Sequence, residues 1–126
     1  MFKDILKGEK GVKIEGAPSL RAWTDREQLS FVLEGIFKGI ISSLGRGKSL
    51  KIRLGEFETD EGEERFFGHL GLPAKRGILI EIIWPATRDD LDLEFLLAQR
   101  VMARLGIMEV QRGRVMIKLS AVRGDG

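Results

Sequence analysis

The chain has 126 residues, of which 43% are hydrophobic and 32% are charged, a composition that supports one ordinary folded domain and excludes intrinsic disorder. It contains no cysteine and a single histidine, His69, which excludes a disulfide framework, a thiolate metal site, a cysteine nucleophile and a multi-histidine metal cluster. The 21 basic and 19 acidic residues are interspersed, so no strong field for a polyanionic partner is evident.

No segment has the length and apolar character of a membrane span or a signal peptide. The longest apolar stretches are interrupted by charge, at Glu34, Lys38 and Glu81. A chain without cysteine fits a reducing cytoplasm. We therefore expect residues 1–126 to form one cytoplasmic domain, in which residues 1–10 are a flexible segment or the remnant of an upstream helix.

The first half of the chain predicts a strand, a long helix and another strand. Residues 12–15 alternate as a short strand does. Thr24 and Glu27 have the spacing of a capping box, in which their side chains accept hydrogen bonds from amides of the first helical turn. From there to Gly45, apolar residues recur at steps of three and four and predict one buried stripe, made of Leu29, Val32, Leu33, Ile36, Phe37, Ile40, Ile41 and Leu44. Residues 49–57 alternate again, which predicts a strand with one solvated face.

The second half begins with an acid-rich segment. Six of the nine residues from 56 to 64 are acidic, which is typical of a solvated hairpin tip, here leading into a further strand over 65–70. Residues 77–84 are apolar on both faces, which predicts a central strand. A second helix over about 89–105 and a closing hairpin over 107–119 complete the pattern.

This order of elements predicts the fold class. Two helices interspersed among six strands favour an α+β domain, a two-layer α/β sandwich in which the helices lie on one face of a mixed sheet. The other face of the sheet is left open.

Three segments of the chain resemble one protein family. Residues 18–36 carry the pattern P-x-L-x-A-x-x-D-x-x-x-L-x-x-V-L-x-x-I, which resembles the helix that opens the ATP-binding domain of sensor histidine kinases. Residues 97–110 and 113–119 are similar to the last helix and closing hairpin of that family, with the strand at 80–82 in register. The likeness covers residues 12–119 and implies the ATPase-like fold of the histidine kinases.

The residues with which this family binds the adenine and the metal are replaced here. The resemblance puts Gly35 and Gly39 at the places of two asparagines, the second of which holds magnesium, and a glycine offers no ligand atom. It puts Trp84, Ala86 and Arg88 on a D-x-G-x-G box, whose aspartate accepts a hydrogen bond from adenine. An indole donates a hydrogen bond but does not accept one.

The phosphate-binding end of the family's pocket is replaced as well. About five residues separate Ala86 from Asp92, so the family's long lid over the nucleotide is missing. Asp92 and Glu94 stand where two glycines would grip the phosphates through backbone amides. With Asp89 and Asp90 they place four carboxylates in the first turns of the second helix, where they repel a polyphosphate.

Two of these positions keep more than one interpretation. Two glycines inside a helix cost about 2 kcal/mol relative to alanines, and they create a flat strip beside Glu34, Lys38 and Ser42. The strip at Gly35 and Gly39 is close packing against a loop of the same domain, a docking face for a partner, or a surviving ligand pocket.

The other candidate residues also admit structural interpretations. Trp84 is a packed core edge, and one version of that hypothesis has it filling the vacant adenine cavity. The four carboxylates at the helix start complement the helix dipole or bind a divalent cation. His69, in a glycine- and proline-containing segment at a strand end, is predicted to be structural.

A nucleic-acid-binding sheet is a separate alternative. Basic residues occur on predicted strands, with Phe66 and Phe67 nearby, as in sheet-based nucleic-acid binders. They are Lys51, Arg53, Arg112, Arg114 and Lys118. This alternative requires that their strands be adjacent.

We therefore expect a degenerate histidine-kinase-type ATPase-like domain, a pseudokinase that binds no ATP, uses no cofactor or metal and has no catalytic residues. It would act as an interaction or regulatory module in two-component signalling, through the glycine strip and the acidic helix start. The partners that the resemblance implies are a phosphoacceptor and dimerisation helix pair or a receiver domain. The rival interpretations are a divergent kinase domain that still binds ATP and magnesium, and the nucleic-acid binder.

Overall fold

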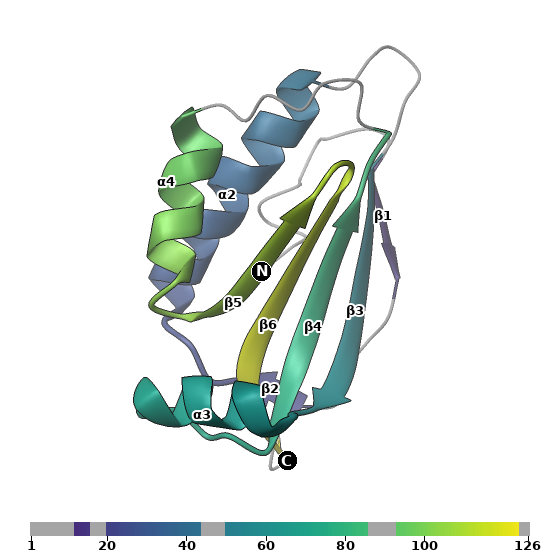
Figure 1. Cartoon of the computed structure of the whole chain (residues 1–126). Helices are drawn as coiled ribbons and strands as arrows, with labels where there is room; N and C mark the ends of the chain where they lie inside the picture. Colours follow the sequence, from purple (N-terminus) through teal and green to yellow (C-terminus); the bar gives the residue numbers. More distant parts are fainter. Residues whose placement is uncertain (1–11, 16–19, 44–49, 86–92, 124–126) are drawn as a thin grey trace.

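The computed structural model describes residues 12–15, 20–43, 50–85 and 93–123. Within them the elements, in chain order, are β1 (Val12–Glu15), β2 (Leu20–Ala22), α2 (Arg26–Ser43), β3 (Leu50–Glu58), α3 (Glu61–His69), β4 (Arg76–Ile83), α4 (Leu93–Met102), β5 (Gly106–Gln111) and β6 (Arg114–Arg123). The chain is α+β, as its element pattern predicts (Figure 1).

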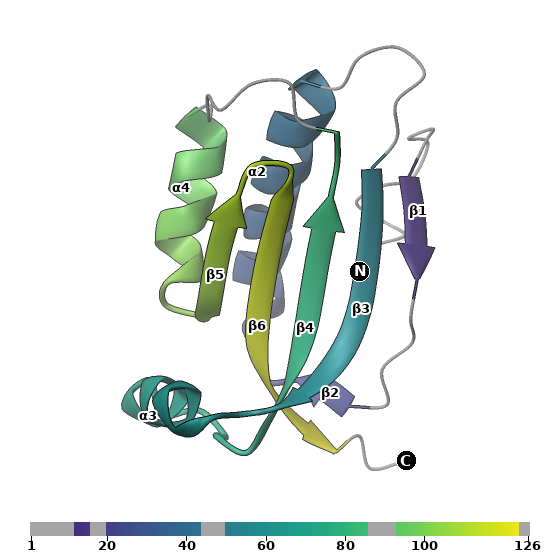
Figure 2. The ribbon, with the colours of Figure 1, turned by 45° about the vertical axis from the view of Figure 1, so that its right-hand side comes forward.

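The strands of the described residues form one mixed, six-stranded sheet (Figure 2). Its order is β1-β3-β4-β6-β2, and β5 also pairs with β6. β1 runs parallel to β3, whereas the other pairs are antiparallel. β5 pairs with residues 114–119 and β2 with 121–123 of β6. These two strands therefore follow one another along the same edge of β6.

The helices α2 and α4 pack side by side on one face of the sheet (Figures 1 and 2). The arrangement predicted from the sequence holds for these two helices. α3 is different, because its Glu63 contacts Lys118, whose neighbours Ile117 and Leu119 point into the core under α2 and α4. α3 therefore meets the opposite face, near one end of the sheet. No helix in the described ranges is long and apolar enough to cross a membrane.

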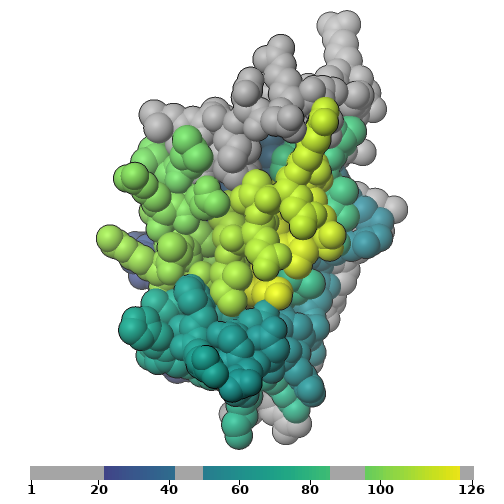
Figure 3. Space-filling model, in the orientation of Figure 1, coloured from purple at the N-terminus to yellow at the C-terminus, as the bar shows by residue number. Residues whose placement is uncertain are grey.

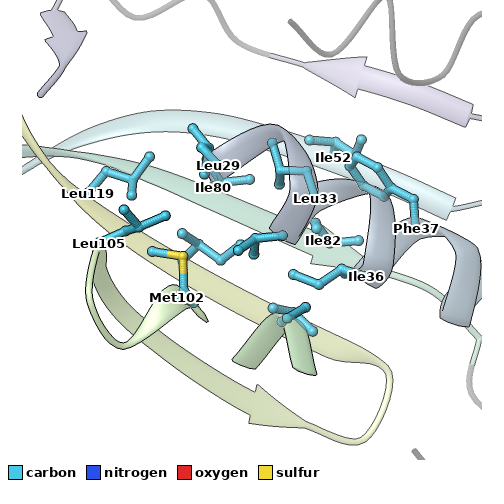
Figure 4. Packing of buried hydrophobic residues seen from close by; sticks show 14 of the residues in the cluster. Leu29, Leu33, Ile36, Phe37, Ile52, Ile80, Ile82, Met102, Leu105 and Leu119 are labelled. Carbon is cyan, nitrogen blue, oxygen red and sulfur yellow. The ribbon is translucent and has the colours of Figure 1, made fainter. Parts of the chain in front are cut away.

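The main core lies between the sheet and the two helices α2 and α4 (Figure 4). Alternate residues of β4 and β6 supply one side of it, namely Ile78, Ile80, Ile82, Val115, Ile117 and Leu119. α2 supplies the other side with its predicted stripe, of which Leu29, Val32, Leu33, Ile36, Phe37 and Ile40 are buried. Each such side chain stabilises the fold by about 1.5–3 kcal/mol relative to an exposed one. Ile41 packs against the margin of this cluster, and Leu44 lies outside the described residues.

The acid-rich segment forms a helix, so the predicted hairpin tip over 56–64 and strand over 65–70 are wrong. Asp60 caps α3 by accepting a hydrogen bond from the Glu63 amide at 2.8 Å, and the Asp60 amide donates to Glu63 Oε1 at 2.9 Å. Acidic side chains in the first turn also complement the helix dipole. The acids therefore mark a helix start, and the first residues of the segment extend β3 to Glu58.

The start of α2 also differs from the prediction. The Gln28 amide donates to Asp25 Oδ1 at 3.0 Å, so Asp25 is the N-cap and not Thr24. The reason is that the Trp23 amide still donates to the Ser120 carbonyl at 2.7 Å, which keeps the chain on the sheet until just before the helix. The Thr24 hydroxyl is buried and has no hydrogen-bond partner in the described part of the chain.

Gly77 of β4 is predicted to tolerate no side chain. A Cβ built on it would lie 2.3 Å from the Phe57 ring on β3 and 2.6 Å from the Leu119 carbonyl oxygen. The second contact is with backbone, which does not move aside without disturbing the ladder. We expect Gly77→Ala to lower the free energy of unfolding by about 1–3 kcal/mol, measured by urea denaturation.

Gly55 of β3 provides the matched control, because a Cβ there meets nothing within 4 Å. Gly55→Ala should leave the unfolding free energy unchanged or raise it by up to about 1 kcal/mol. Equal losses in the two variants would show that the close approach at Gly77 is not the cause.

Candidate functional site

The predicted glycine strip lies on the middle of α2. Gly35 and Gly39 are half-buried, whereas Glu34 and Lys38 are exposed. Ser42 belongs to the last turn of the helix, and its side chain lies outside the described residues. Phe31 precedes Gly35 by four residues, so it lies in the same row on the helix surface.

The helices α2 and α4 carry large apolar side chains that face solvent. Phe31 on α2 is 54% exposed, and Leu96 and Leu97 on α4 are 46% and 45% exposed. Single exposed apolar residues are ordinary on protein surfaces, but several on one layer are typical of a contact surface. Sequence reasoning missed them because it followed only the buried stripes, although apolar residues off those stripes were the available signal.

Of the positions matched to the family's nucleotide box, the described residues include Trp84. Its side chain is half-buried and packs against the main core, and its amide donates to the Gly113 carbonyl at 3.0 Å. The interpretation of Trp84 as a packed core edge agrees with these contacts. Glu94 lies in the first turn of α4, but its side chain lies outside the described residues, as do Ala86, Arg88, Asp89, Asp90 and Asp92.

The sequence predicted that His69 lies at the end of a strand, and this is wrong. It is the last residue of α3 and is exposed. The same helix carries Phe66 and Phe67, whose rings meet edge to face with centroids 6.0 Å apart. Phe67 is fully buried, whereas Phe66 is 36% exposed.

The open face of the sheet brings basic residues together, as the nucleic-acid alternative requires. Lys51 and Arg114 lie in one row, paired across Ile83 of β4. One row further, Arg53 and Glu81 lie side by side and form an ion pair at 3.6 Å between Nη1 and Oε1. Glu81 also forms an ion pair with Arg114 of the neighbouring row. Glu81 is buried, with only 7% of its surface exposed, and it neutralises part of this basic charge. Because Phe66 and Phe67 lie on α3, those aromatics form no stacking platform on the basic strands.

A cavity of about 600 Å³ lies where α3, the end of α4 and the β5–β6 hairpin meet. Its wall includes the apolar side chains of Phe66, Ile107 and Met108 and the charged groups of Asp60, Glu63, Glu109 and Lys118. A volume of this size is typical of ligand and side-chain binding sites. Sequence reasoning missed the cavity because it depends on α3, which was not predicted.

An ion pair between Lys118 and Glu63 anchors one side of this cavity. Lys118 Nζ lies 2.6 Å from Glu63 Oε2 and 5.5 Å from the centre of the Phe57 ring. The hydrogen bond that Lys118 donates to Glu63 raises the pKa of Lys118 above its ordinary 10.5, although burial opposes this. The negative charges of Glu63, Glu109 and Asp60 raise the same pKa further. The cavity is therefore an acidic environment.

Comparison with known proteins adds no assignment to this geometry, since no protein-family model matches the sequence and no curated protein matches it.

The Lys118–Glu63 pair predicts a loss of stability at high pH. Because the pKa of Lys118 is raised in the folded state, the stabilisation is fully present below pH 10.5 and is lost as the pH rises through the higher folded-state value. Lys118→Met should lower the unfolding free energy by about 1 kcal/mol at pH 8. That difference from the wild type should shrink above pH 10.5, as measured by urea unfolding across the pH range.

The exposed pair of Arg65 and Glu61 on α3 is the control. Its side chains are 77% and 82% exposed, with 2.9 Å between Nη2 and Oε1, so Arg65→Met should change stability by less than about 0.5 kcal/mol. A Lys118→Met loss that persists unchanged to pH 12 would mean that packing of the lysine stem, and not its charge, stabilises the fold.

Proposed function

We propose that this chain is a degenerate ATPase-like domain of the histidine-kinase type, which does not bind ATP and acts as an interaction or regulatory module in two-component signalling. The family enters through the resemblance over residues 12–119. The element order supports it, because two helices lie on one face of a mixed sheet and the β5–β6 hairpin follows the second of them.

The observation that carries the loss of nucleotide binding is the position of Trp84. The resemblance assigns this position to the aspartate that accepts a hydrogen bond from adenine. Here the side chain packs against the core at the end of β4, beside the turn at Gly113. Its indole offers no acceptor and occupies volume that a base would need. Gly39, in the magnesium position, supplies no ligand atom.

The exposed apolar residues of the helix layer support the interaction role. Phe31, Leu96 and Leu97 place hydrophobic surface on two adjacent helices, and Gly35 and Gly39 lie on the same helix as Phe31. A pair of amphipathic helices, such as a phosphoacceptor and dimerisation helix pair, is the partner that this surface fits best. Binding to a receiver domain instead is an outcome that the experiment below distinguishes.

Calorimetric titration with ATP and magnesium tests the first half of the proposal. We expect no binding tighter than about 1 mM, which corresponds to about −4 kcal/mol. A Trp23→Phe background leaves Trp84 as the single tryptophan, since the chain has two, and its emission should resist quenching by acrylamide and stay unchanged when ATP is added. A dissociation constant below about 100 μM would favour the divergent, ATP-binding kinase.

The proposed interaction role is tested with a histidine-phosphotransfer helix pair and a receiver domain as separate binding probes. The helix pair should bind the wild type, and the Phe31→Ser, Leu97→Ser double variant should bind it at least tenfold more weakly. Glu58→Gln, an exposed change on β3, is the control and should bind normally. Equal binding by all three proteins, or binding of the receiver alone, would contradict the helix-layer surface.

A further inference from the structure

The cavity beside α3 follows the outer edge of β5. It is lined by Ile107 and Glu109, which point to one face of the sheet, and by Met108, which points to the other. Gln99 of α4 and Ala103, which follows the helix, close its far side. Because residues of both faces reach it, the cavity lies at the edge of the strand and not above one face. Figure 3 looks onto this part of the surface, where α3 adjoins the β5–β6 hairpin.

The outer edge of β5 carries backbone N–H and C=O groups that are not used in pairing with β6. In the described part of the chain β5 pairs with β6 alone. A two-residue turn joins the strands, so Gln111 and Arg114 form a hydrogen-bonded pair and every second residue of β5 does the same. The N–H and C=O groups of Met108 and Val110 are then directed away from β6. An edge of this kind accepts an additional strand.

The charge of the cavity determines which side chain of an added strand it can bind. Asp60, Glu63 and Glu109 are acidic, whereas Lys118 is the basic residue of the wall and already pairs with Glu63. Glu109 is exposed, and its charge acts on Lys118 from a distance, without a hydrogen bond or ion pair between them in the described residues. A cation entering from outside is therefore attracted, and the partly exposed aromatic ring of Phe66 lies in the same cavity wall.

We propose that an extended segment of a partner polypeptide adds to the sheet along the outer edge of β5 and places an arginine side chain in this cavity. The planar guanidinium stacks on Phe66 and donates to Glu109, and its apolar stem packs against Ile107, which points to the same face as Glu109. The partner's main chain bonds to the free groups of Met108 and Val110. This surface lies on α3 and β5, away from the helix layer, and does not depend on the absence of ATP binding.

Synthetic peptides test the proposal with the full chain. The probe is a seven-residue, end-capped peptide of alternating threonine and valine with a central arginine, labelled for fluorescence anisotropy. We expect a dissociation constant below 1 mM, at least tenfold weaker binding when norleucine replaces the arginine, and at least tenfold weaker binding for free agmatine. Hydrogen exchange of the Met108 and Val110 amides should slow when the peptide is bound.

Variants of the cavity wall provide the second arm. Glu109→Gln and Phe66→Ala change partly exposed side chains, so both should fold, as far-ultraviolet circular dichroism would verify. Each should weaken binding of the arginine peptide at least fivefold. Glu34→Gln removes an exposed carboxylate from α2 and should leave the affinity unchanged.

Three results would overturn the proposal. Equal binding of the norleucine peptide would remove the role of the cavity charge. Agmatine binding as tightly as the peptide would assign the cavity to a small amine. No binding of the arginine peptide up to 1 mM would show that the edge does not accept it. None of these results depends on whether ATP binds, so failure here and failure of the proposed function are distinguishable.

Discussion

The whole arrangement depends on burial of one face of the sheet beneath α2 and α4. Ile80 and Ile117 sit opposite one another at the centre of that face, on β4 and β6. Because strand residues alternate, packing this face determines which side chains reach the other. The register that buries Ile80 also directs Glu81 and Met116 to the opposite face, so the polar groups found there are a consequence of the apolar packing.

The opposite face is stabilised in a different way. Near one end, Glu81 holds Arg53 and Arg114, so three strands are joined through a buried carboxylate. Near the other end, α3 contacts the face through the pair of Glu63 and Lys118, and Phe67 of the same helix is fully buried. A sheet with such unequal faces has room for two separate surfaces, one on the helix layer and one beside α3.

The sequence was informative wherever a single periodicity governed burial. The α2 stripe repeats without a break over more than three turns, which predicted the helix, and the apolar run of residues 77–84, bounded by Pro85, predicted the central strand β4. α3 was missed because acidic residues favour both solvated loops and helix starts, and only the reciprocal bonds of Asp60 and Glu63 decide between them. Thr24 and Asp25 are both residue types that cap helices, and the hydrogen bond of the Trp23 amide to the sheet leaves Asp25 as the cap. The cavity at β5 was beyond sequence reasoning, since it is formed by segments that are distant in the chain.

The pairing of β2 with β6 has a consequence for how the chain reaches this fold. Leu20 is opposite Arg123, so one of the earliest strands finds its neighbour only among the last described residues. β1, by contrast, pairs with β3, which is much nearer to it in the sequence than β6 is to β2. Pairings between distant segments close large loops and slow folding. During synthesis on the ribosome, β2 would lack its pairing strand until β6 has emerged, and that interval is when a chaperone would find most to bind.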